Sequence, residues 1–439
     1  GVYVVEQWLA RRFTLAGRLA LGGLGAAAIV GLDTNRTVAY QAFAFLAAIL
    51  AMSLAASLLF RAHFTVERRL PRYGTAGVPL PYRLSVESQS ARRQSDLLLV
   101  EELADPRPSL AELLAGREPG EERRNWFDRT VAYPRWVWLI GQNRQAAPAE
   151  QAVPPLPARG RTEVSMSIVP TRRGHLRFVA TTVARPDPFG LFKACVRVPA
   201  PGSVLVLPRR YPVPRVTLPG RRRYQRGGVS LTTSVGDSEE FAALRDYRPG
   251  DPLRRVHWKS WARLGKPIVK EYQDEFFVRH ALVLDTFAAT PPVDGARFEE
   301  AVSVAASYAC AIATQESLLD LLFVGPEAYA FTMGRGLAHT ERLLEILAGV
   351  RACTTHPFDA LARLALDRHS ALSGAICVLL AWDEPRQALI TALEARGVPT
   401  LVLVLGEPSA PEAREPDLLP SGGLHFLSPG RVAEGLAQL

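Results

Sequence analysis

Two halves of the chain with different sequence patterns are separated by one segment in the middle, GDSEEFAALRDYRPGDPLRRVHWKSWARLGKPIVKE (residues 236–271). Charged side chains are interleaved in it with the aromatic residues Phe241, Tyr247, Trp258 and Trp261. A solvated charge run rarely carries so many aromatic residues, and a core segment rarely carries so many charges. This signature segment therefore predicts a partly buried ionic network or a binding surface.

The residues after the signature segment alternate between compact apolar runs and stretches with helical spacing. This alternation predicts a doubly wound, mostly parallel α/β domain over residues 276–439. The runs that predict strands are HALVLDT (280–286), LLDLLFVG (318–325), GAICVLLAW (374–382) and PTLVLVLG (399–406), and those that predict helices are ARFEEAVSVAASYACAIATQ (296–315), TERLLEILAGV (340–350) and EPRQALITALEARG (384–397).

Residues 63–208 have a different pattern, with short runs of alternating apolar residues separated by Pro, Gly or polar clusters. Such runs predict antiparallel strands, here a β-sandwich. In ARPDPFGLFKA (184–194), Pro188 and Gly190 suit a turn that delivers Phe189 and Phe192 into a core. The predicted strands lie in FTVERRLPR (64–72), VPLPYRLSVES (78–88), SDLLLVEEL (95–103), RTEVSMSIVP (161–170), HLRFVATTVAR (175–185) and SVLVLP (203–208).

An irregular stretch interrupts this pattern between residues 118 and 161. It contains YPRWVWLIGQNR (133–144), in which Trp136 and Trp138 lie near Arg135 and Arg144. Tryptophan and arginine favour the headgroup zone of a membrane, so the stretch is compatible with an interfacial contact. The alternative is one more strand with alternate tryptophans buried.

The N-terminal 62 residues predict a membrane anchor with two spans, residues 13–32 and 38–60. The second runs for about 23 positions without a charge, enough to cross a bilayer, whereas the first is less uniformly apolar and includes Arg18. The positive-inside rule predicts a two-pass protein of the bacterial inner membrane with its soluble domains in the cytoplasm. The basic residues are Arg11, Arg12 and Arg18 around the start of the pair, and Arg61, Arg68, Arg69 and Arg72 after its end.

Composition limits the function only weakly. The 439 residues have a formal net charge of +9, which suits an anionic partner such as a membrane surface. The four cysteines, Cys195, Cys310, Cys353 and Cys377, form no CxxC pair and no metal-ligand spacing. Disulfides are not required, which agrees with a reducing compartment.

A basic linker precedes the signature segment, and we group the two as residues 209–275. Arginine-rich linkers can contact anionic lipid or nucleic acid. No RNA-recognition, zinc-finger or helix-turn-helix pattern accompanies this one. We therefore expect no nucleic-acid partner and keep nucleic-acid binding as an alternative function. The arginines are Arg209, Arg210, Arg215, Arg221, Arg222, Arg223 and Arg226, with no acidic residue among them.

The signature segment resembles that of the DUF58 family, bacterial proteins of unknown biochemical activity. The shared pattern is Glu-Phe, Leu-Arg-x-Tyr, Gly-Asp, Arg-x-His-Trp-Lys and Ala-Arg at fixed spacings, although Trp261 stands where the family more often has serine. ARPDPFGLFKA resembles a second family element, and the resemblance covers nearly the whole chain. The signature and docking candidates are Glu240, Phe241, Leu244, Arg245, Tyr247, Gly250, Asp251, Arg255, His257, Trp258, Lys259 and Arg263.

The resemblance implies a von Willebrand factor A-like fold for residues 276–439. In that fold the first strand is followed by Asp-x-Ser-x-Ser, whose oxygens bind a divalent metal. Here Asp285 and Thr286 are followed by apolar residues at both serine positions. We therefore expect no cofactor. A degenerate Mg²⁺ site at Asp285, Thr286 and Asp383 is the alternative, because two carboxylates alone make a thin site for a hard cation.

The run RVHWK (255–259) predicts a strand with Arg255, His257 and Lys259 on one face. That face favours an ion-paired seam or a docking surface for an acidic partner. The catalytic alternative is a hydrolase in which His257 is the general base and Asp251, Glu239 or Glu240 its carboxylate partner. No nucleophile elbow, H-E-x-x-H or phosphate loop supports it, so we assign no catalytic residue and favour a protein that is not an enzyme.

The resemblance also implies partners. DUF58 proteins are typically encoded beside MoxR-type AAA+ ATPases, often with transglutaminase-like membrane proteins. We therefore predict a membrane-anchored, non-catalytic adaptor or scaffold that works with a MoxR-type ATPase in protein assembly or maturation. The lipid bilayer and a transglutaminase-like membrane protein are its other predicted partners. We expect the signature segment to bridge the β-rich and α/β domains.

Overall fold

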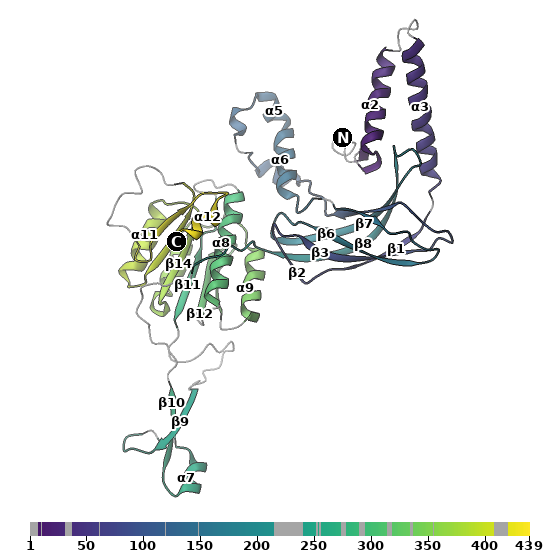
Figure 1. Cartoon of the computed structure of the whole chain (residues 1–439). Helices are drawn as coiled ribbons and strands as arrows, with labels where there is room; N and C mark the ends of the chain where they lie inside the picture. The colour runs from purple at the N-terminus through teal and green to yellow at the C-terminus, as the bar shows by residue number, and fades with distance from the viewer. Residues whose placement is uncertain are drawn as a thin grey trace. The chain divides into compact units, whose positions relative to one another are not determined.

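The computed structural model divides the chain into two compact units, Gly1–Leu207 and Pro208–Leu439, which we call the first and second units (Figure 1). The second unit contains the signature segment and a mixed α/β sheet. The structure describes residues 8–9, 11–30, 37–60, 62–118, 120–147, 149–214, 240–251, 253, 256–273, 278–288, 295–313, 318–333, 337–353, 355–407 and 420–439.

Two apolar helices, α2 (Leu15–Val30) and α3 (Thr37–Leu58), lie side by side at the start of the first unit (Figure 1). The 22 residues of α3 carry no charge and extend about 33 Å, enough to cross a bilayer core of about 30 Å. The 16 residues of α2 include Arg18 and extend only about 24 Å. Within the described residues, α3 is the one helix long and apolar enough to cross a membrane.

Two sheets form the rest of the framework of the first unit. One has the strand order β1-β3-β6 and the other β2-β8-β7-β4-β5. Neighbouring strands are antiparallel except for the short β2–β8 pair. Each of the six predicted strand runs contains a strand. The bounds are β1 Phe64–Arg69, β2 Tyr73–Thr75, β3 Leu80–Ser88, β4 Leu97–Leu103, β5 Glu150–Val153, β6 Arg161–Ile168, β7 Gly174–Pro186 and β8 Lys193–Leu207.

The alternating pattern of these strands produces one shared core. In β6, Val164, Met166 and Ile168 are buried and the residues between them are exposed or half-buried. They belong to a single hydrophobic cluster with residues of both sheets, such as Leu84 of β3 and Leu99 of β4. Each fully buried side chain of this kind contributes about 1.5–3 kcal/mol, so the cluster holds the two sheets together.

A buried ion pair links the two sheets. The Arg68 Nη2 atom in β1 lies 2.6 Å from the Glu101 Oε2 atom in β4, and the side chains are 3% and 0% exposed. Thr181 donates a hydrogen bond to Glu101, and the guanidinium lies 4.6 Å from the centre of the Phe178 ring. Arg68 is one of the basic residues that follow the second predicted span, but its charge is neutralised inside the core and does not face a membrane.

The turn in ARPDPFGLFKA supports the foot of α2. The Asp187 carboxylate accepts backbone hydrogen bonds from Phe189, Leu191 and Phe192, and Thr14, just before α2, donates its hydroxyl to the Gly190 carbonyl at 2.6 Å. Phe192 is buried, as predicted, but Phe189 is exposed. The prediction for Phe189 is wrong because Gly190, with φ of 67°, turns the chain and leaves Phe189 at the tip.

A helical insert joins β4 to β5. The strand predicted as one alternative for residues 133–144 is wrong, because these residues form α6. Pro134 suits the first helical turn, and Ile140 is buried on the inner side of the helix. The insert contains α4 (Leu110–Ala115), a 3-10 turn (Glu121–Arg123), α5 (Trp126–Val131) and α6 (Tyr133–Asn143).

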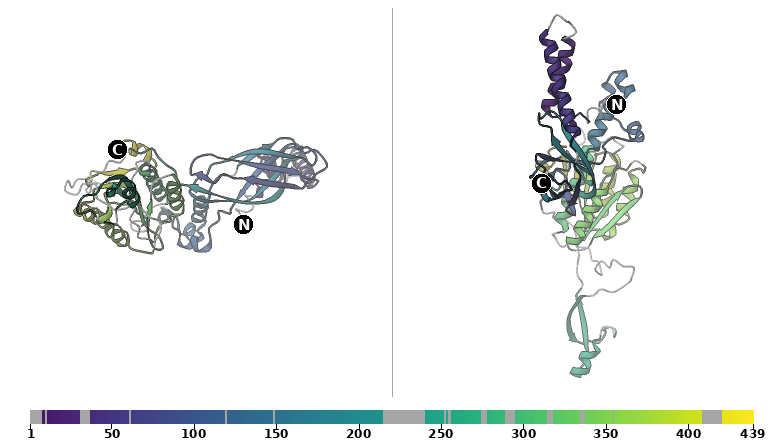
Figure 2. Two further views of the ribbon diagram at one scale, coloured as in Figure 1. Left: turned by 90° about the horizontal axis from the view of Figure 1, so that it is seen from below. Right: turned by 90° about the vertical axis from the view of Figure 1, so that its right-hand side faces the viewer.

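The main sheet of the second unit has the order β13-β12-β11-β14-β15-β16. All pairs are parallel except β12–β13, so the mostly parallel α/β prediction is confirmed. Figures 1 and 2 show helices on both faces, with α8 and α11 on opposite sides. The bounds are β11 Arg279–Leu284, α8 Gly295–Ala313, β12 Leu318–Val324, β13 Ala328–Met333, α9 Leu337–Gly349, α10 Asp359–Leu366, a 3-10 turn His369–Ala371, β14 Gly374–Leu379, α11 Glu384–Ala395, β15 Thr400–Leu405, β16 Leu424–Leu427 and α12 Val432–Ala437.

Candidate functional site

The described part of the signature segment forms a two-stranded antiparallel hairpin with a helix near its tip (Figure 1). Strand β9 (Glu240–Asp246) pairs with β10 (Ile268–Gln273), and α7 (Trp258–Leu264) precedes β10. The strand predicted for residues 255–259 is therefore wrong. Lys, Ala, Arg and Leu favour a helix, and Gly265, with φ of 69°, ends it in the left-handed conformation.

An arginine–aspartate pair closes the loop after β9. The Arg245 guanidinium donates two hydrogen bonds of 2.7 Å to the Asp251 carboxylate, which also accepts the Arg248 amide at 2.8 Å. These bonds, that to Arg245 foremost, lower the pKa of Asp251 to about 2. Gly250, with φ of 106°, makes the tight turn that brings Asp251 back to Arg245.

His257 contacts a hydroxyl group rather than Asp251. Its Nδ1 atom lies 2.6 Å from the Ser260 Oγ atom, and its backbone amide donates to the Ile268 carbonyl. Asp251 is engaged by Arg245, so the predicted pairing of His257 with Asp251 is absent from the described geometry. His257 stands at the N-terminus of α7, where the contact with Ser260 is a local one between residues three apart.

The outer side of α7 is apolar and basic. Trp258 stacks on Trp261 with ring centres 5.2 Å apart, yet Trp258 remains 61% exposed. Lys259 and Arg263 are exposed on the same short helix, and neither makes an ion pair within the described chain. Other exposed apolar side chains of the hairpin are Leu244, Leu253 and Leu264.

Several predicted site residues are only partly described. Glu240 and Phe241 lie in β9 by their backbones, but their side chains fall outside the described part, and Arg255 lies outside it altogether. Tyr247 is tied to the hairpin by the hydrogen bond from its amide to the Pro267 carbonyl. The hairpin thus brings together Arg245 with Asp251 and Trp258 with Trp261.

The three candidate metal ligands meet at the carboxyl end of the main sheet, where an arginine contacts both carboxylates. Arg386 Nε donates to Asp285 Oδ2 at 2.6 Å and Arg386 Nη1 to Asp383 Oδ2 at 2.5 Å. Asp285 also accepts the amides of Phe287 and Leu380, and the Thr286 hydroxyl donates to the Val324 carbonyl. A divalent ion would therefore have to displace the guanidinium, and metal binding there stays a prediction from the sequence.

Arg386, which contacts two of the three candidate ligands, was missed by the sequence argument. It is 1% exposed and lies in the first turn of α11, where a positive charge opposes the helix dipole. Asp383, the N-cap of α11, accepts from both the amide and the guanidinium of Arg386. An arginine three positions after an N-cap aspartate, at a position where a helix disfavours it, is the signal that points to this contact.

The family comparison supports the resemblance over part of the chain. Residues 243–381 match the family model "Protein of unknown function DUF58". This range begins in β9 and includes α7 and the main-sheet strands from β11 to β14. The region around Asp285 and the greater part of the signature hairpin therefore belong to one family match.

A curated relative and two solved structures complete the comparisons. The "Uncharacterized protein YeaD" of Bacillus subtilis (strain 168) is 27% identical over 230 residues, which span 52% of this chain and 55% of the relative. The CARDB domain of PF1109 from Pyrococcus furiosus is 12% identical over 33% of this chain and 94% of that one, with a TM-score of 0.18. A GH20 exo-β-N-acetylglucosaminidase from Vibrio harveyi is 10% identical over 79% and 57%, with a TM-score of 0.16. Scores this low carry no structural argument.

Proposed function

We propose that the protein is a membrane-anchored, non-catalytic adaptor and that its signature hairpin is a docking surface for a protein partner. The observation that carries the proposal is Trp258, which remains 61% exposed although it stacks on Trp261. Tryptophan and arginine are the residues most enriched among those that dominate binding energy at protein interfaces. Lys259 and Arg263 add positive charge beside it, which suits an acidic partner surface.

The shape of the hairpin supports docking more than catalysis. Arg245 and Asp251 hold the loop after β9 with two hydrogen bonds, so the surface is preformed, which lowers the entropy lost on binding. His257 contacts Ser260 and not Asp251, so it lacks the orienting carboxylate predicted for a general base. Preformed shape with exposed aromatic and basic residues is typical of a docking element.

The paired apolar helices supply the anchor in this proposal. We propose that α2 and α3 cross the inner membrane as a two-pass hairpin and that both units lie in the cytoplasm. Helix α3 is long and apolar enough to span by itself. Thr14 and Gly17, at the start of α2, contact the turn of the first unit closely, so the anchor is joined directly to the folded part.

The partner that the family resemblance implies is a MoxR-type AAA+ ATPase, with a transglutaminase-like membrane protein as a further partner. We propose that the signature hairpin binds the ATPase and that the von Willebrand factor A-like sheet presents a client for assembly or maturation. In this proposal Arg386 takes the place of a divalent cation between Asp285 and Asp383. Its single positive charge then offsets one of the two carboxylate charges at the end of the sheet, and the site does not respond to metal.

The hydrolase alternative rests on one observation, the 2.6 Å contact between His257 Nδ1 and Ser260 Oγ. A histidine that contacts a serine hydroxyl is the first half of an activated nucleophile. This alternative requires the imidazole to be oriented by a third group. Nucleic-acid binding rests on arginines of which Arg215, Arg221, Arg222, Arg223 and Arg226 lie outside the described residues.

The decisive experiment is affinity purification of the tagged full-length protein from native membranes, followed by identification of the ATPase. We expect the ATPase to co-purify with the wild type and to be lost from a Trp258→Ala, Lys259→Glu double variant. The matched control is Arg342→Glu, which reverses an exposed charge on α9 of the same unit. This control should retain the ATPase.

A His257→Ala variant separates docking from catalysis. Docking predicts that the variant keeps most of the bound ATPase, because the tryptophan surface remains. Catalysis predicts the same binding, but it also predicts that His257→Ala and Ser260→Ala each abolish a hydrolytic activity. Equal recovery of the ATPase with wild type and the Trp258→Ala, Lys259→Glu variant would contradict the docking proposal.

A further inference from the structure

The helical insert of the first unit exposes large apolar side chains. Leu114 on α4 is 73% exposed and Trp126 on α5 is 72% exposed. Isolated exposed hydrophobic residues need no explanation, but a run of them on neighbouring helices marks an interaction surface. The other exposed apolar residues of the insert are Leu110, Phe127, Val131, Tyr133 and Val137.

The exposure is not a sign of weak structure, because the insert is firmly capped and attached. Ser109 and Glu112 form a reciprocal capping box on α4, and Asn125 caps α5. The end of α6 is tied to the loop between β6 and β7, where Thr171 donates to the Arg144 carbonyl and Arg172 to the Gln142 side chain. Helices this short need such support, so the apolar side chains are held outward by a stable scaffold.

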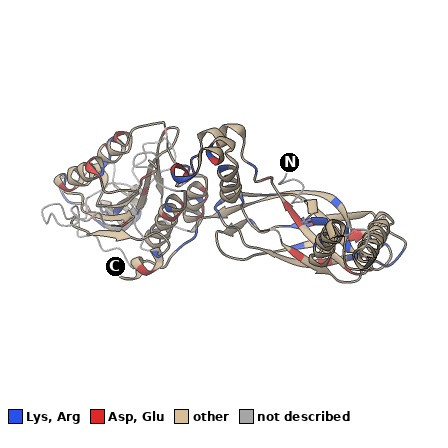
Figure 3. Cartoon of the chain, turned by 90° about the horizontal axis from the view of Figure 1, so that it is seen from above, with Lys and Arg blue, Asp and Glu red and all other residues tan. Residues whose placement is uncertain are grey.

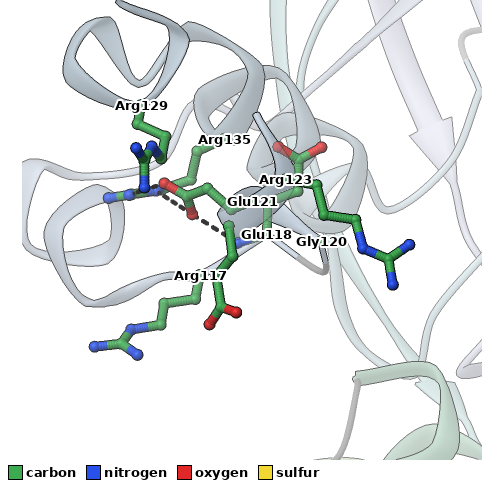
Figure 4. Close-up of a pocket in the computed structure, with 8 residues that line it drawn as sticks. Arg117, Glu118, Gly120, Glu121, Arg123, Arg129 and Arg135 are labelled. Atoms are coloured by element: carbon green, nitrogen blue, oxygen red, sulfur yellow. Dashed lines mark hydrogen bonds and ion pairs between the residues drawn. The ribbon is translucent and has the colours of Figure 1, made fainter. Parts of the chain in front are cut away.

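Arginines gather beside these apolar residues. Together with Glu118, Glu121 and Glu122 they line a cavity of about 690 Å³ at the 3-10 turn (Figure 4). Arg135 is held by Glu121, but Arg117, Arg123 and Arg129 make no hydrogen bond or ion pair through their guanidinium groups within the described residues. These three guanidinium groups lie on the same insert as the exposed aromatic rings, a combination that suits an anionic, amphipathic surface.

The insert projects from the same side of the first unit as the apolar helix pair. In Figures 1 and 2, α5 and α6 rise beside α2 and α3, and the insert reaches the level of the lower part of the pair. Figure 3, seen from above, shows α2 and α3 nearly free of charged residues and both signs of charge on the insert. Phe189, at the turn that supports α2, is also exposed.

We propose that the insert is a second membrane contact, which lies in the headgroup zone of anionic phospholipid while α2 and α3 anchor the chain. The exposed rings and aliphatic side chains enter the boundary between headgroups and acyl chains. Arg117, Arg123 and Arg129 contact lipid phosphates. The inference rests on the proposed anchoring, and it adds a specific element that fixes the orientation of the first unit on the membrane.

The test uses full-length protein in nanodiscs with an environment-sensitive fluorophore on one introduced cysteine. Cys195→Ser and Cys310→Ser remove the native cysteines that are not buried. Trp126→Cys reports on the insert, and Ser165→Cys, exposed on the outer face of β6, is the matched control. Spin-labelled phospholipid should quench the Trp126→Cys probe and leave the Ser165→Cys probe unchanged.

A second comparison tests the arginines. Replacing phosphatidylcholine partly by phosphatidylglycerol should increase quenching at the Trp126→Cys probe. An added Arg117→Gln, Arg123→Gln, Arg129→Gln change should remove that increase. Intact anchoring in nanodiscs with no quenching at the Trp126→Cys probe would overturn the inference and leave the anchor proposal standing. Failure of the protein to enter nanodiscs would overturn both the inference and the anchor proposal. Disulfide cross-linking between two Trp126→Cys copies would assign the surface to self-association.

Discussion

Two arginine–aspartate pairs of the second unit have similar bonding but opposite surroundings. In the signature hairpin, Arg245 donates two hydrogen bonds of 2.7 Å to Asp251, and its side chain is 31% exposed. At the end of the main sheet, Arg386 donates to Asp285 at 2.6 Å, and the two side chains are 1% and 0% exposed. The hydrogen-bond lengths do not tell these pairs apart, whereas their solvent exposure does.

The difference in exposure gives the two pairs different roles. Near the surface, water and salt screen the attraction, and exposed pairs contribute little to stability. In the core, the loss of one partner leaves a charge without compensation, which is strongly destabilising. We therefore infer that the pair of Arg386 and Asp285 maintains the fold, while the pair of Arg245 and Asp251 shapes a surface loop for binding.

The largest expected effect is that of Arg386→Met. The substitution keeps an apolar side chain of similar length but leaves the Asp285 carboxylate buried without its cation, which costs about 3–5 kcal/mol. The measurement is hydrogen–deuterium exchange of the β11 and β14 amides in the full-length protein, which reports the stability of the main sheet. Arg342→Met, the same substitution at an exposed ion pair, should change it by at most about 0.5 kcal/mol.

A double variant sharpens this prediction. Asp285→Asn combined with Arg386→Met removes both charges, so it should recover part of the loss, because the buried carboxylate is no longer uncompensated. Equal exchange in wild type and the Arg386→Met variant would show that this region tolerates a buried carboxylate, and the structural role of the pair would be wrong.

Much of the fold follows from sequence periodicity, and the errors have local causes. Alternation in residues 161–168 predicts β6 and its buried Val164, Met166 and Ile168, because a strand with one buried face repeats every two residues. Residues 255–259 also alternate, but helix-forming residues and Gly265 place Trp258 and Lys259 in α7. Over five residues, alternation does not distinguish a strand from a helix start.

The candidate site was only partly accessible from the sequence. The motif pointed to Arg245, Asp251 and Trp258, since their types and spacing stand out in the segment. It did not reveal that Asp251 is used by Arg245 rather than by His257. Contacts between distant residues, such as Arg386 with Asp285 or Arg68 with Glu101, depend on tertiary structure and leave no short motif.

A smaller effect is expected from protonation of His280. This residue lies in β11, the strand that Asp285 follows. His280 is buried, its Nδ1 atom has no hydrogen-bond partner among the described residues, and burial lowers the pKa of its imidazole. Its register neighbours Leu319 and Gly374 carry no charge. The contribution of neutral His280 to stability is therefore fully present above the usual histidine pKa of about 6.5. It is lost as the pH falls through the lowered pKa of the folded state, because the unfolded chain binds the proton first.

The His280→Leu variant tests this pH dependence. Histidine titrates over a range of about pH 7.5 to pH 5. The decrease in exchange protection of β11 over this range should be smaller in the variant than in the wild type. An Arg342→Met control should retain the wild-type decrease. Identical pH dependence in the wild type and the His280→Leu variant would assign the decrease to other groups.

The smallest effect on stability is expected from Arg245→Met, and it tests the surface half of the comparison. Protection of β11 and β14 should not change, because the pair lies outside the main sheet. Recovery of the ATPase should fall, since the loop after β9 loses the contact that preforms it.

High salt should also lower recovery of the ATPase with the wild type, because the exposed pair and the docking charges are screened. The pKa of Asp251, lowered to about 2, keeps the pair charged throughout the range in which His280 titrates, so a change between pH 7.5 and 5 should leave the loop intact. An Arg245→Asp, Asp251→Arg exchange should restore binding if the pair acts by shaping the loop, and should fail to restore it if Arg245 itself contacts the partner.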